Sequence, residues 1–259
     1  MTNLNCIYQD EHVYAIQKPQ GIPFHTTRLN EQDAELAGQA YQEGIVVLAK
    51  RFLEDEQIFP VHRLDMMTSG LMVFARHARA NRELSMALEN KTIEKYYLAL
   101  SKDKPKKKQG AVIGDMLKAR SGSYKLNRST ENPAITRFFA GKIALNRDDS
   151  AWLFALKPES GKTHQLRVAL KSLGSPILGD QRYGGASASR GYLHAYKMRF
   201  DLFGKRYSLC APDFNGEEFS LDAFSACENV ENEPLNFLAP ETLAWPKTAF
   251  KLGSEKLGI

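Results

Sequence analysis

Residues 62–75 read HRLDMMTSGLMVFA, and this stretch decides how the rest of the chain is interpreted. Residues 71–75 are a fully apolar run of strand length, which is typical of a strand buried on both faces. Residues 62–70 have no periodicity and combine one carboxylate, Asp65, with basic side chains and small hydroxyl residues. The pattern therefore predicts a loop that presents Asp65 at the start of a buried strand.

Hydrophobic patterning predicts the elements on both sides of this stretch. Residues 6–17 are typical of two short strands joined by a polar turn, and residues 77–90 carry an apolar face at helical spacing. Residues 96–100 and 151–156 are expected to be strands, and the lysine-rich residues 102–108 a solvated hairpin tip. Because these elements alternate without regular βαβ spacing, we predict an α+β fold with a mixed sheet.

Residues 161–167, GKTHQLR, bring basic and amide side chains into the first turns of a predicted helix. Thr163 is expected to cap this helix, leucines at helical spacing to face the core, and Gly174 to end it. Cations are disfavoured at a helix N-terminus unless an anion lies near them. We expect Arg167 to have such an anion, either Asp65 or a phosphate, with a solvated basic helix start as the alternative.

Local chemistry alone leaves two roles open for Asp65. Neighbouring cations keep a carboxyl group ionised, which suits a nucleophile or a base. A structural turn carboxylate paired with Arg63 would show the same pattern. The roles of Tyr96 and Tyr97 are also open, because neighbouring strand residues point to opposite faces. One of these tyrosines can line a cleft and stack on a base while the other packs in the core, and packing of both is the alternative.

Positive charge is concentrated in the middle of the chain. The formal net charge is +5, but residues 91–142 contain thirteen Lys or Arg against four Asp or Glu. A polyanion is therefore expected to bind this region and to be repelled by the acidic residues 213–235. Within it, residues 118–128 interleave cations with Tyr124 and the flexible Gly122, as a phosphate-gripping hairpin would, and a plain solvated loop is the default alternative. The candidate cations are Lys118, Arg120 and Lys125.

Several protein classes are excluded by what the sequence lacks. No apolar stretch approaches the run of about twenty residues that crosses a bilayer, and the N-terminus has no secretory pattern, so we expect a cytoplasmic protein without a membrane partner. The six histidines and three cysteines do not fall at metal-ligand spacings, and no glycine-rich phosphate loop occurs. We therefore expect neither a metal nor a cofactor.

Three segments, in this order, resemble the RluA-type family of RNA pseudouridine synthases. They are residues 8–21 (YQDEHVYAIQKPQG), residues 62–76 (HRLDMMTSGLMVFAR) and residues 161–184 (GKTHQLRVALKSLGSPILGDQRYG). K-x-Y at 95–97 and RGYLHA at 190–195 extend the similarity to about residues 5–213. The resemblance implies the pseudouridine synthase fold, with a largely antiparallel sheet, flanking helices and a central catalytic cleft. It also implies isomerisation of uridine in ribosomal or transfer RNA.

Carried over to this sequence, the resemblance implies roles for particular residues. Asp65 is expected to be the catalytic aspartate, Tyr97 to stack on the target uracil, and Arg167 to form an ion pair with Asp65. Leu166 is expected to form an apolar wall, and Arg63 to enter the space left by the flipped-out uridine. Further substrate contacts are expected from His62, Leu64, Thr68 and His164, together with the three cations of residues 118–128.

The sequence departs from the family pattern at two places. Met66 and Met67 follow Asp65 where relatives commonly carry a charged residue, and Ala169 replaces a usual histidine. Both departures are expected to change substrate contacts more than catalysis.

Residues 1–225 are expected to form the catalytic domain and residues 226–259 a polar tail, with no separate N-terminal RNA-binding domain. We expect a monomer that binds RNA and not DNA. A non-catalytic RNA-binding protein that keeps the fold is the alternative, but a pure binder needs no carboxylate beside an RNA backbone. The presence of Asp65, Tyr97 and Arg167 therefore favours an enzyme.

Overall fold

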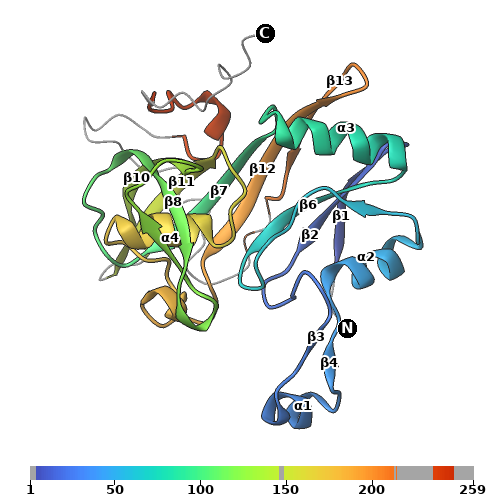
Figure 1. The fold of residues 1–259 in the computed structure, drawn as a ribbon, viewed down its shortest axis with the longest axis horizontal. Helices are drawn as coiled ribbons and strands as arrows, with labels where there is room; N and C mark the ends of the chain where they lie inside the picture. Colours follow the sequence, from blue (N-terminus) through green and yellow to red (C-terminus); the bar gives the residue numbers. More distant parts are fainter. Residues whose placement is uncertain (1–3, 146–148, 213, 215–235, 248–259) are drawn as a thin grey trace.

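The computed structural model describes residues 4–145, 149–212, 214 and 236–247 (Figure 1). The strands are β1 (Asn5–Gln9), β2 (Val13–Lys18), β3 (Thr27–Arg28), β4 (Tyr41–Gln42), β5 (Phe59–Pro60), β6 (Ser69–Ala75), β7 (Glu94–Ser101), β8 (Gln109–Lys118), β9 (Tyr124–Asn127), β10 (Ala134–Ala144), β11 (Ser150–Pro158), β12 (Leu193–Leu202) and β13 (Lys205–Cys210). The helices are α1 (Glu31–Ala37), α2 (Ile45–Leu53), α3 (Ala78–Glu89) and α4 (Gln165–Ser172), with short 3-10 turns η1 (Arg120–Gly122), η2 (Gln181–Tyr183) and η3 (Pro240–Thr242).

One eleven-stranded sheet organises the molecule. Its hydrogen-bonded order is β1–β2–β6–β12–β7–β11–β10–β8–β9, with β13 paired to β12 and β5 to β6. Within the described residues, β6 and β12 form its one parallel pair, with His194 opposite Ser69 and Ala195 opposite Gly70. The predicted mixed, largely antiparallel sheet is therefore confirmed.

The apolar stretch that follows the Asp65 loop is buried as predicted. All seven residues of β6 are buried between β2 and β12. The polar turn between β1 and β2 is closed by Asp10, whose side chain accepts hydrogen bonds from the backbone N–H groups of His12 and Val13. The helix expected over residues 77–90 is α3, and the His77 side chain caps it by accepting from Ala80 N at 3.2 Å.

Residues 102–108 do not form the predicted hairpin tip. β8 pairs with β10 and β9, so two strands separate it from β7. The segment crosses to the far part of the sheet, held there by the bond from Lys106 N to Leu173 O at 3.0 Å. The lysines of residues 102–108 correctly predict that this segment is exposed, but they do not predict which strand β8 pairs with.

The start of α4 also differs from the prediction. His164, in the left-handed conformation (φ 57°), is the N-cap residue, and Thr163 lies outside the helix. The side chain of Gln165 determines this start, because its Oε1 accepts from Ser160 Oγ and from Lys162 N and so closes the turn that precedes the helix. Gly174 follows the C-cap with φ 76°, as expected for the residue that ends a helix.

Residues 236–247 pack on the sheet, although residues 226–259 are expected to be a polar tail. Phe237 is fully buried, and the Trp245 ring lies 5.4 Å from that of Phe139. These two aromatic side chains explain the packing, because their burial removes a large apolar area from water. Apart from Phe214, the acidic residues 213–235 lie outside the described residues, and the boundary at 225 stays a prediction.

Candidate active site

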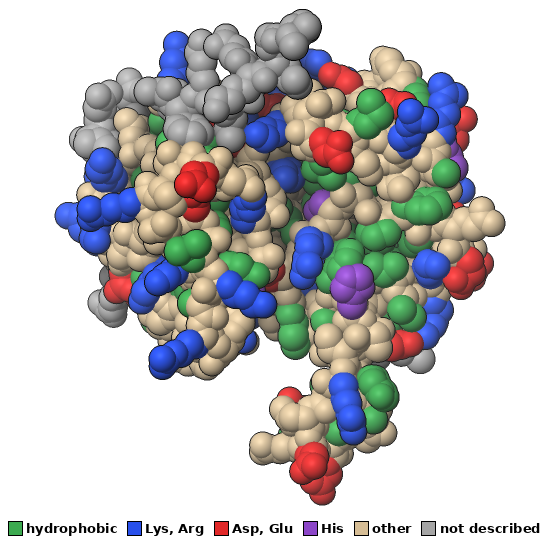
Figure 2. Space-filling view, viewed as in Figure 1, with side chains coloured by type: hydrophobic (Ala, Val, Ile, Leu, Met, Phe, Trp, Pro, Cys, Tyr) green, Lys and Arg blue, Asp and Glu red, His purple; other side chains and the backbone are tan. Residues whose placement is uncertain are grey.

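A cavity of about 780 Å³ lies where the Asp65 loop faces β7 and the start of α4. Lys and Arg side chains surround the hollow on the face of the molecule shown in Figure 2. Nine of the residues expected in the site line this cavity together. They are His62, Arg63, Leu64, Asp65, Thr68, Tyr97, His164, Leu166 and Arg167.

The loop that carries Asp65 is held from below by the buried lysine at the end of β2. Lys18 Nζ donates to Thr68 O at 2.8 Å and to Met66 O at 3.3 Å, and Gly21 N donates to Met66 O at 2.7 Å. Burial lowers the pKa of Lys18 to about 7, against the nearby charge of Asp65, which raises it. These bonds fix the backbone that presents the Asp65 carboxylate.

Two carboxylates share the guanidinium of Arg167. Its Nη1 lies 3.4 Å from Asp65 Oδ2, which is the expected pairing. Its Nε and Nη2 donate to the buried carboxylate of Asp180 at 2.7 and 2.8 Å. Burial works to lower the pKa of Arg167, but the bonds to Asp180 and the charges of both carboxylates raise it overall. Asp180 therefore holds a permanent cation in position beside Asp65.

A turn that requires glycine places Asp180 beneath Arg167. Gly179 has φ 81°, and a Cβ at this position would stand 1.8 Å from Arg190 O. Only glycine permits so close a backbone approach. The next residue, Asp180, is consequently delivered into the interior, where its side chain is about 1% exposed.

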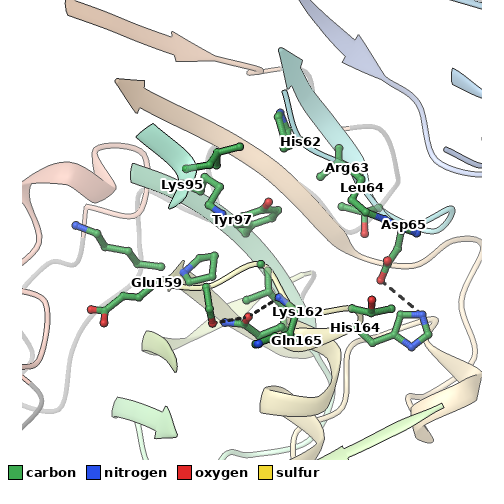
Figure 3. Close-up of a pocket in the computed structure, with 18 of the residues that line it drawn as sticks. His62, Arg63, Leu64, Asp65, Lys95, Tyr97, Glu159, Lys162, His164 and Gln165 are labelled. Carbon is green, nitrogen blue, oxygen red and sulfur yellow. Dashed lines mark hydrogen bonds and ion pairs between the residues drawn. The ribbon is translucent and has the colours of Figure 1, made fainter. Parts of the chain in front are cut away.

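His164 lies on the other side of Asp65. Figure 3 shows Asp65 pointing toward it, and its Nε2 lies 4.0 Å from Asp65 Oδ2. Its Nδ1 is hydrogen-bonded to Tyr183 Oη at 2.8 Å, and Tyr183 Oη also accepts from Tyr124 N at 2.9 Å. Burial lowers the pKa of His164, against the charge of Asp65, so the ring is neutral at pH 7.

The walls of the cavity are aromatic and apolar. Tyr97 reaches it from β7 with 9% of its surface exposed, and Leu64, Leu166 and Leu193 are buried around it. Burial and the nearby charge of Asp65 raise the pKa of Tyr97, so its hydroxyl keeps its proton at neutral pH. A flat apolar ring with polar edges fits such walls beside a carboxylate.

His62 contacts the sheet as well as the cavity. Its Nε2 accepts a hydrogen bond from Val73 N at 3.2 Å, and burial lowers its pKa to about 3, so the ring is neutral. The proton then lies on Nδ1, which is buried and has no hydrogen-bond partner among the described protein atoms. His62 therefore ties the loop before β6 to Val73 within that strand, in addition to its expected contact with substrate.

The alternative in which Asp65 pairs with Arg63 finds no support in this geometry. The Arg63 side chain is exposed, and its guanidinium lies 5.6 Å from the centre of the Phe24 ring. Among the described residues, the basic groups within 4.0 Å of the Asp65 carboxylate are those of Arg167 and His164.

The cavity has a positive rim. Six Lys or Arg side chains line it against three Asp or Glu. Two of the acids are already paired within the protein, Glu94 with Lys157 at 2.5 Å and Glu159 with Arg137. Lys95 is half-buried, and burial lowers its pKa. Such a rim suits a phosphate backbone.

Three expected binding residues lie apart from this cavity. Lys118, Arg120 and Lys125 are exposed on the β8–β9 hairpin and do not line it. The described residues also contain no cluster of three or more His, Cys, Asp or Glu side chains that could hold a metal ion. None of the described helices is long and apolar enough to span a membrane.

Comparison with known proteins identifies the family. The family model described as RNA pseudouridylate synthase matches residues 12–172, which include the loop of Asp65, the strand of Tyr97 and the helix of Arg167. The chain belongs to the RNA pseudouridylate synthase family. Enzymes of this family isomerise uridine to pseudouridine in RNA. The predicted family is confirmed.

Relatives of known name agree with this assignment. The chain is 43% identical to an uncharacterized RNA pseudouridine synthase of Haemophilus influenzae, over 81% of this chain and 88% of the relative. It is 32% identical to ribosomal large subunit pseudouridine synthase D of Borreliella burgdorferi, over 76% of this chain and 60% of that protein. It is 30% identical to tRNA pseudouridine synthase C of Vibrio cholerae, over 76% and 85%.

The fold is shared with a solved pseudouridylate synthase structure. Human RNA Pseudouridylate Synthase Domain Containing 1 superposes with a TM-score of 0.66 at 22% identity, over 95% of this chain and 97% of that one. The predicted pseudouridine synthase fold is confirmed.

Sequence reasoning missed three residues that build this pseudouridylate synthase site. Lys18, Asp180 and Tyr183 occur within segments that resemble the family, but nothing local separates them from surface residues. The available signal was glycine placement, because Lys18 is followed by Pro-Gln-Gly and Asp180 follows Gly179 directly. Glycines at such positions indicate a tight turn that buries its neighbours.

Proposed function

We propose that Asp65, Tyr97 and Arg167 isomerise a uridine of ribosomal or transfer RNA to pseudouridine in this cavity. The observation that carries the proposal is the ion pair between Asp65 and an arginine that Asp180 clamps, beside a buried aromatic wall. Relatives named for ribosomal and for transfer RNA support both substrate classes. We further propose that the protein acts as a monomer in the cytoplasm and acts on RNA and not DNA.

In this proposal Asp65 acts as an ionised carboxylate. The reaction breaks the N-glycosidic bond, rotates the uracil and joins it to the ribose through carbon 5. Carbon 5 loses its proton and N1 gains one, so that the product is an isomer of uridine. Attack at the anomeric carbon, attack at carbon 6 and removal of a ribose proton all require the same charged oxygen. Arg167 orients that oxygen, because its own position is fixed by Asp180.

Tyr97 and the leucines act on the detached base. A uracil stacked on Tyr97 between Leu64 and Leu166 is shielded from water while it is detached from the ribose. Stacking of this kind contributes about 1 to 3 kcal/mol per base.

The target uridine must first leave its RNA stack, at a cost of a few kcal/mol. The exposed Arg63 lies on the rim of the cavity, where its planar guanidinium can fill the gap in the stack. Lys118, Arg120 and Lys125 extend the positive surface over the β8–β9 hairpin, and we assign them to the RNA backbone.

Pseudouridine mapping tests this function. Total RNA is modified with carbodiimide and read by primer extension, from cells with the gene deleted and then complemented with wild type or Asp65→Asn. We expect one or more sites to vanish on deletion and to return only with wild type. The purified Asp65→Asn protein should bind RNA within about threefold of wild type, because one carboxylate among many phosphate contacts changes little.

Two results would contradict the proposal. Return of the lost sites with Asp65→Asn would exclude Asp65 as the catalytic group. An unchanged map after deletion, with RNA binding intact, would favour the alternative of a protein that only binds RNA.

A further inference from the structure

A second cavity of about 600 Å³ lies outside the catalytic one, between the β8–β9 hairpin, α4 and η2. The hairpin, the outer face of the helix and the turn after it each contribute one side. We call this cavity the hairpin groove. Its lining residues are Ala119, Ser123, Tyr124, Lys125, Leu126, Val168, Lys171, Ser172, Gln181, Arg182, Tyr183 and Gly184.

Cations from three different elements converge on the hairpin groove. Lys125 comes from β9, Lys171 from α4 and Arg182 from η2, and all three are exposed. None of the described residues that line the groove is acidic. Among described residues, no ion pair neutralises any of these cations, in contrast to Arg167 and Lys157 of the other cavity, which are paired with carboxylates.

Two of these cations lie at the turn of residues 181–184. The guanidinium of Arg182 donates to Ser121 O in the hairpin turn. Lys171 Nζ lies 3.1 Å from the position that a Cβ on Gly184 would take, so it lies against the turn that carries Arg182. Like charges gathered in a concave site repel each other unless an anion lies between them, and walls of low polarity strengthen their field. The arrangement is therefore suited to an anion.

The hairpin groove and the catalytic cavity share a wall. Tyr183 and Tyr124 line the groove, while His164 lines the cavity. Tyr183 Oη is bonded to His164 Nδ1 at 2.8 Å, and the Tyr124 and His164 rings meet edge to face at 5.6 Å. His164 in turn lies 4.0 Å from the Asp65 carboxylate. One layer of rings thus separates the groove from the reaction site.

We propose that the hairpin groove binds the phosphodiester of a nucleotide that flanks the target uridine, through Lys171 and Arg182. This inference rests on the proposed function, because it takes the RNA in the catalytic cavity as continuous with the RNA in the groove. The volume of the groove lies within the range of sites that enclose a small ligand. The half-buried Tyr124 ring along its wall offers a surface on which the flanking base can stack.

Salt-dependent RNA binding tests the groove. The probe is a fluorescein-labelled RNA hairpin of 17 nucleotides with uridines in its loop, titrated by anisotropy at several salt concentrations. Loss of two phosphate contacts reduces the slope of log K against log salt by about 1.4 to 1.8. We therefore expect Lys171→Ala/Arg182→Ala to show this smaller slope and about tenfold weaker binding at 100 mM salt.

Matched variants distinguish a specific phosphate site in the groove from a general effect of positive charge on RNA binding. Arg79→Ala/Arg82→Ala removes two exposed cations from α3, which packs on β6 and β12 away from the groove (Figure 1). It should leave the slope unchanged. Lys171→Arg/Arg182→Lys keeps both charges and should retain most of the wild-type slope. A groove variant whose slope equals that of the α3 variant would overturn the proposal.

A second readout keeps the two proposals apart. Where wild type forms pseudouridine, the groove variant should raise KM with kcat nearly unchanged, because binding is lost equally from ground and transition states. If the groove variant forms pseudouridine and its salt slope equals that of wild type, the phosphate site in the groove is contradicted and the proposed function is unaffected. If the wild-type protein forms no pseudouridine but the groove variant still has the smaller salt slope, the proposed function is contradicted and the phosphate site is supported.

Discussion

The Asp65 cavity and the hairpin groove are both rich in cations, but the cations that support Asp65 and those of the groove are held in opposite ways. Arg167, which lines the cavity, is about 8% exposed and bonded to Asp180, and Lys18, which holds the Asp65 loop from outside the cavity, is buried with three backbone carbonyl groups as acceptors. In the groove, Lys171 and Arg182 are exposed, and no carboxylate among the described residues pairs with them.

This difference separates two uses of positive charge. A cation that orients a catalytic carboxylate must be fixed before substrate arrives, so it needs internal partners that also offset its burial. A cation that binds a phosphate must be available to the ligand, so it is left unpaired and solvated. Substitutions should therefore change folding stability in the cavity and RNA affinity in the groove.

The largest effect is expected from Asp180→Ala. The substitution leaves the buried Arg167 without its two short hydrogen bonds, which costs about 3 to 5 kcal/mol of the free energy of unfolding. Urea denaturation measures this cost, and pseudouridine formation should fall with it because Asp65 loses an oriented partner. Asp180→Asn keeps a hydrogen-bond acceptor and should be intermediate. If Asp180→Ala is as stable as wild type, Arg167 does not depend on its internal partner, and the contrast with the unpaired cations of the groove is lost.

The next effect concerns the buried histidine beneath the site. His194 bonds Ser69 Oγ and Ala211 O at 2.8 Å each, and burial lowers its pKa from 6.5 to about 4. The unfolded chain therefore binds more protons than the folded chain between pH 6.5 and 4, so stability is lost as pH falls through this window. The loss between pH 7 and 4.5 is about 2.5 kcal/mol.

His194→Gln isolates this contribution. Denaturation of both proteins at pH 7 and pH 4.5 should show a smaller acid loss in the variant, by about 2.5 kcal/mol. Equal losses would mean that His194 does not stay neutral in the fold.

A smaller effect is expected from Tyr183→Phe, at the wall that the two regions share. The change deprives Tyr124 N and His164 Nδ1 of their common partner, which costs about 1 to 2 kcal/mol of stability. Tyr41→Phe, at an exposed tyrosine of β4, is the matched control and should be neutral. Because His164 also loses its orientation, kcat should fall while the salt slope of RNA binding stays near wild type. A reduced slope would show that the wall itself contacts phosphate.

The smallest effect is expected from Lys171→Ala, whose change in the free energy of unfolding should be under about 0.5 kcal/mol. Lys18→Met is the contrasting lysine, because it removes bonds that hold the Asp65 loop and should cost more than about 1 kcal/mol. Urea denaturation of both variants gives the comparison directly. Equal costs would contradict the division between fixed and available cations.

Local patterns were sufficient for much of the fold. The apolar residues 71–75 and the helical spacing of residues 77–90 predict β6 and α3. The pattern of apolar side chains within a few residues is enough to show that a strand or one face of a helix is buried. The path of residues 102–108 was not predictable in this way. The choice of β10 as the partner of β8 depends on packing between distant strands, to which a run of lysines contributes nothing.

The same limit applies to the site. The residues that resemble the family place Asp65, Tyr97 and Arg167 in one cavity, as expected. Asp180 and Lys18 were missed because charged side chains in a sequence are normally exposed, and only their three-dimensional partners make burial possible. Thr163 was expected to cap α4 for a similar reason, because the four hydrogen bonds of Gln165 that set the helix start come from residues up to thirty positions away.

By itself, the sequence determined the mixed fold, the family and the carboxylate on which the proposed chemistry depends, because periodicity and motif residues are local properties. Only the tertiary structure decided which charges are fixed and which are free. That distinction arises when the turn at Gly179 packs against Arg190 and brings Asp180 to Arg167, while Lys171 and Arg182 are left without a carboxylate partner among the described residues. Pairing energies depend on distance and burial, and neither is encoded in the order of the residues.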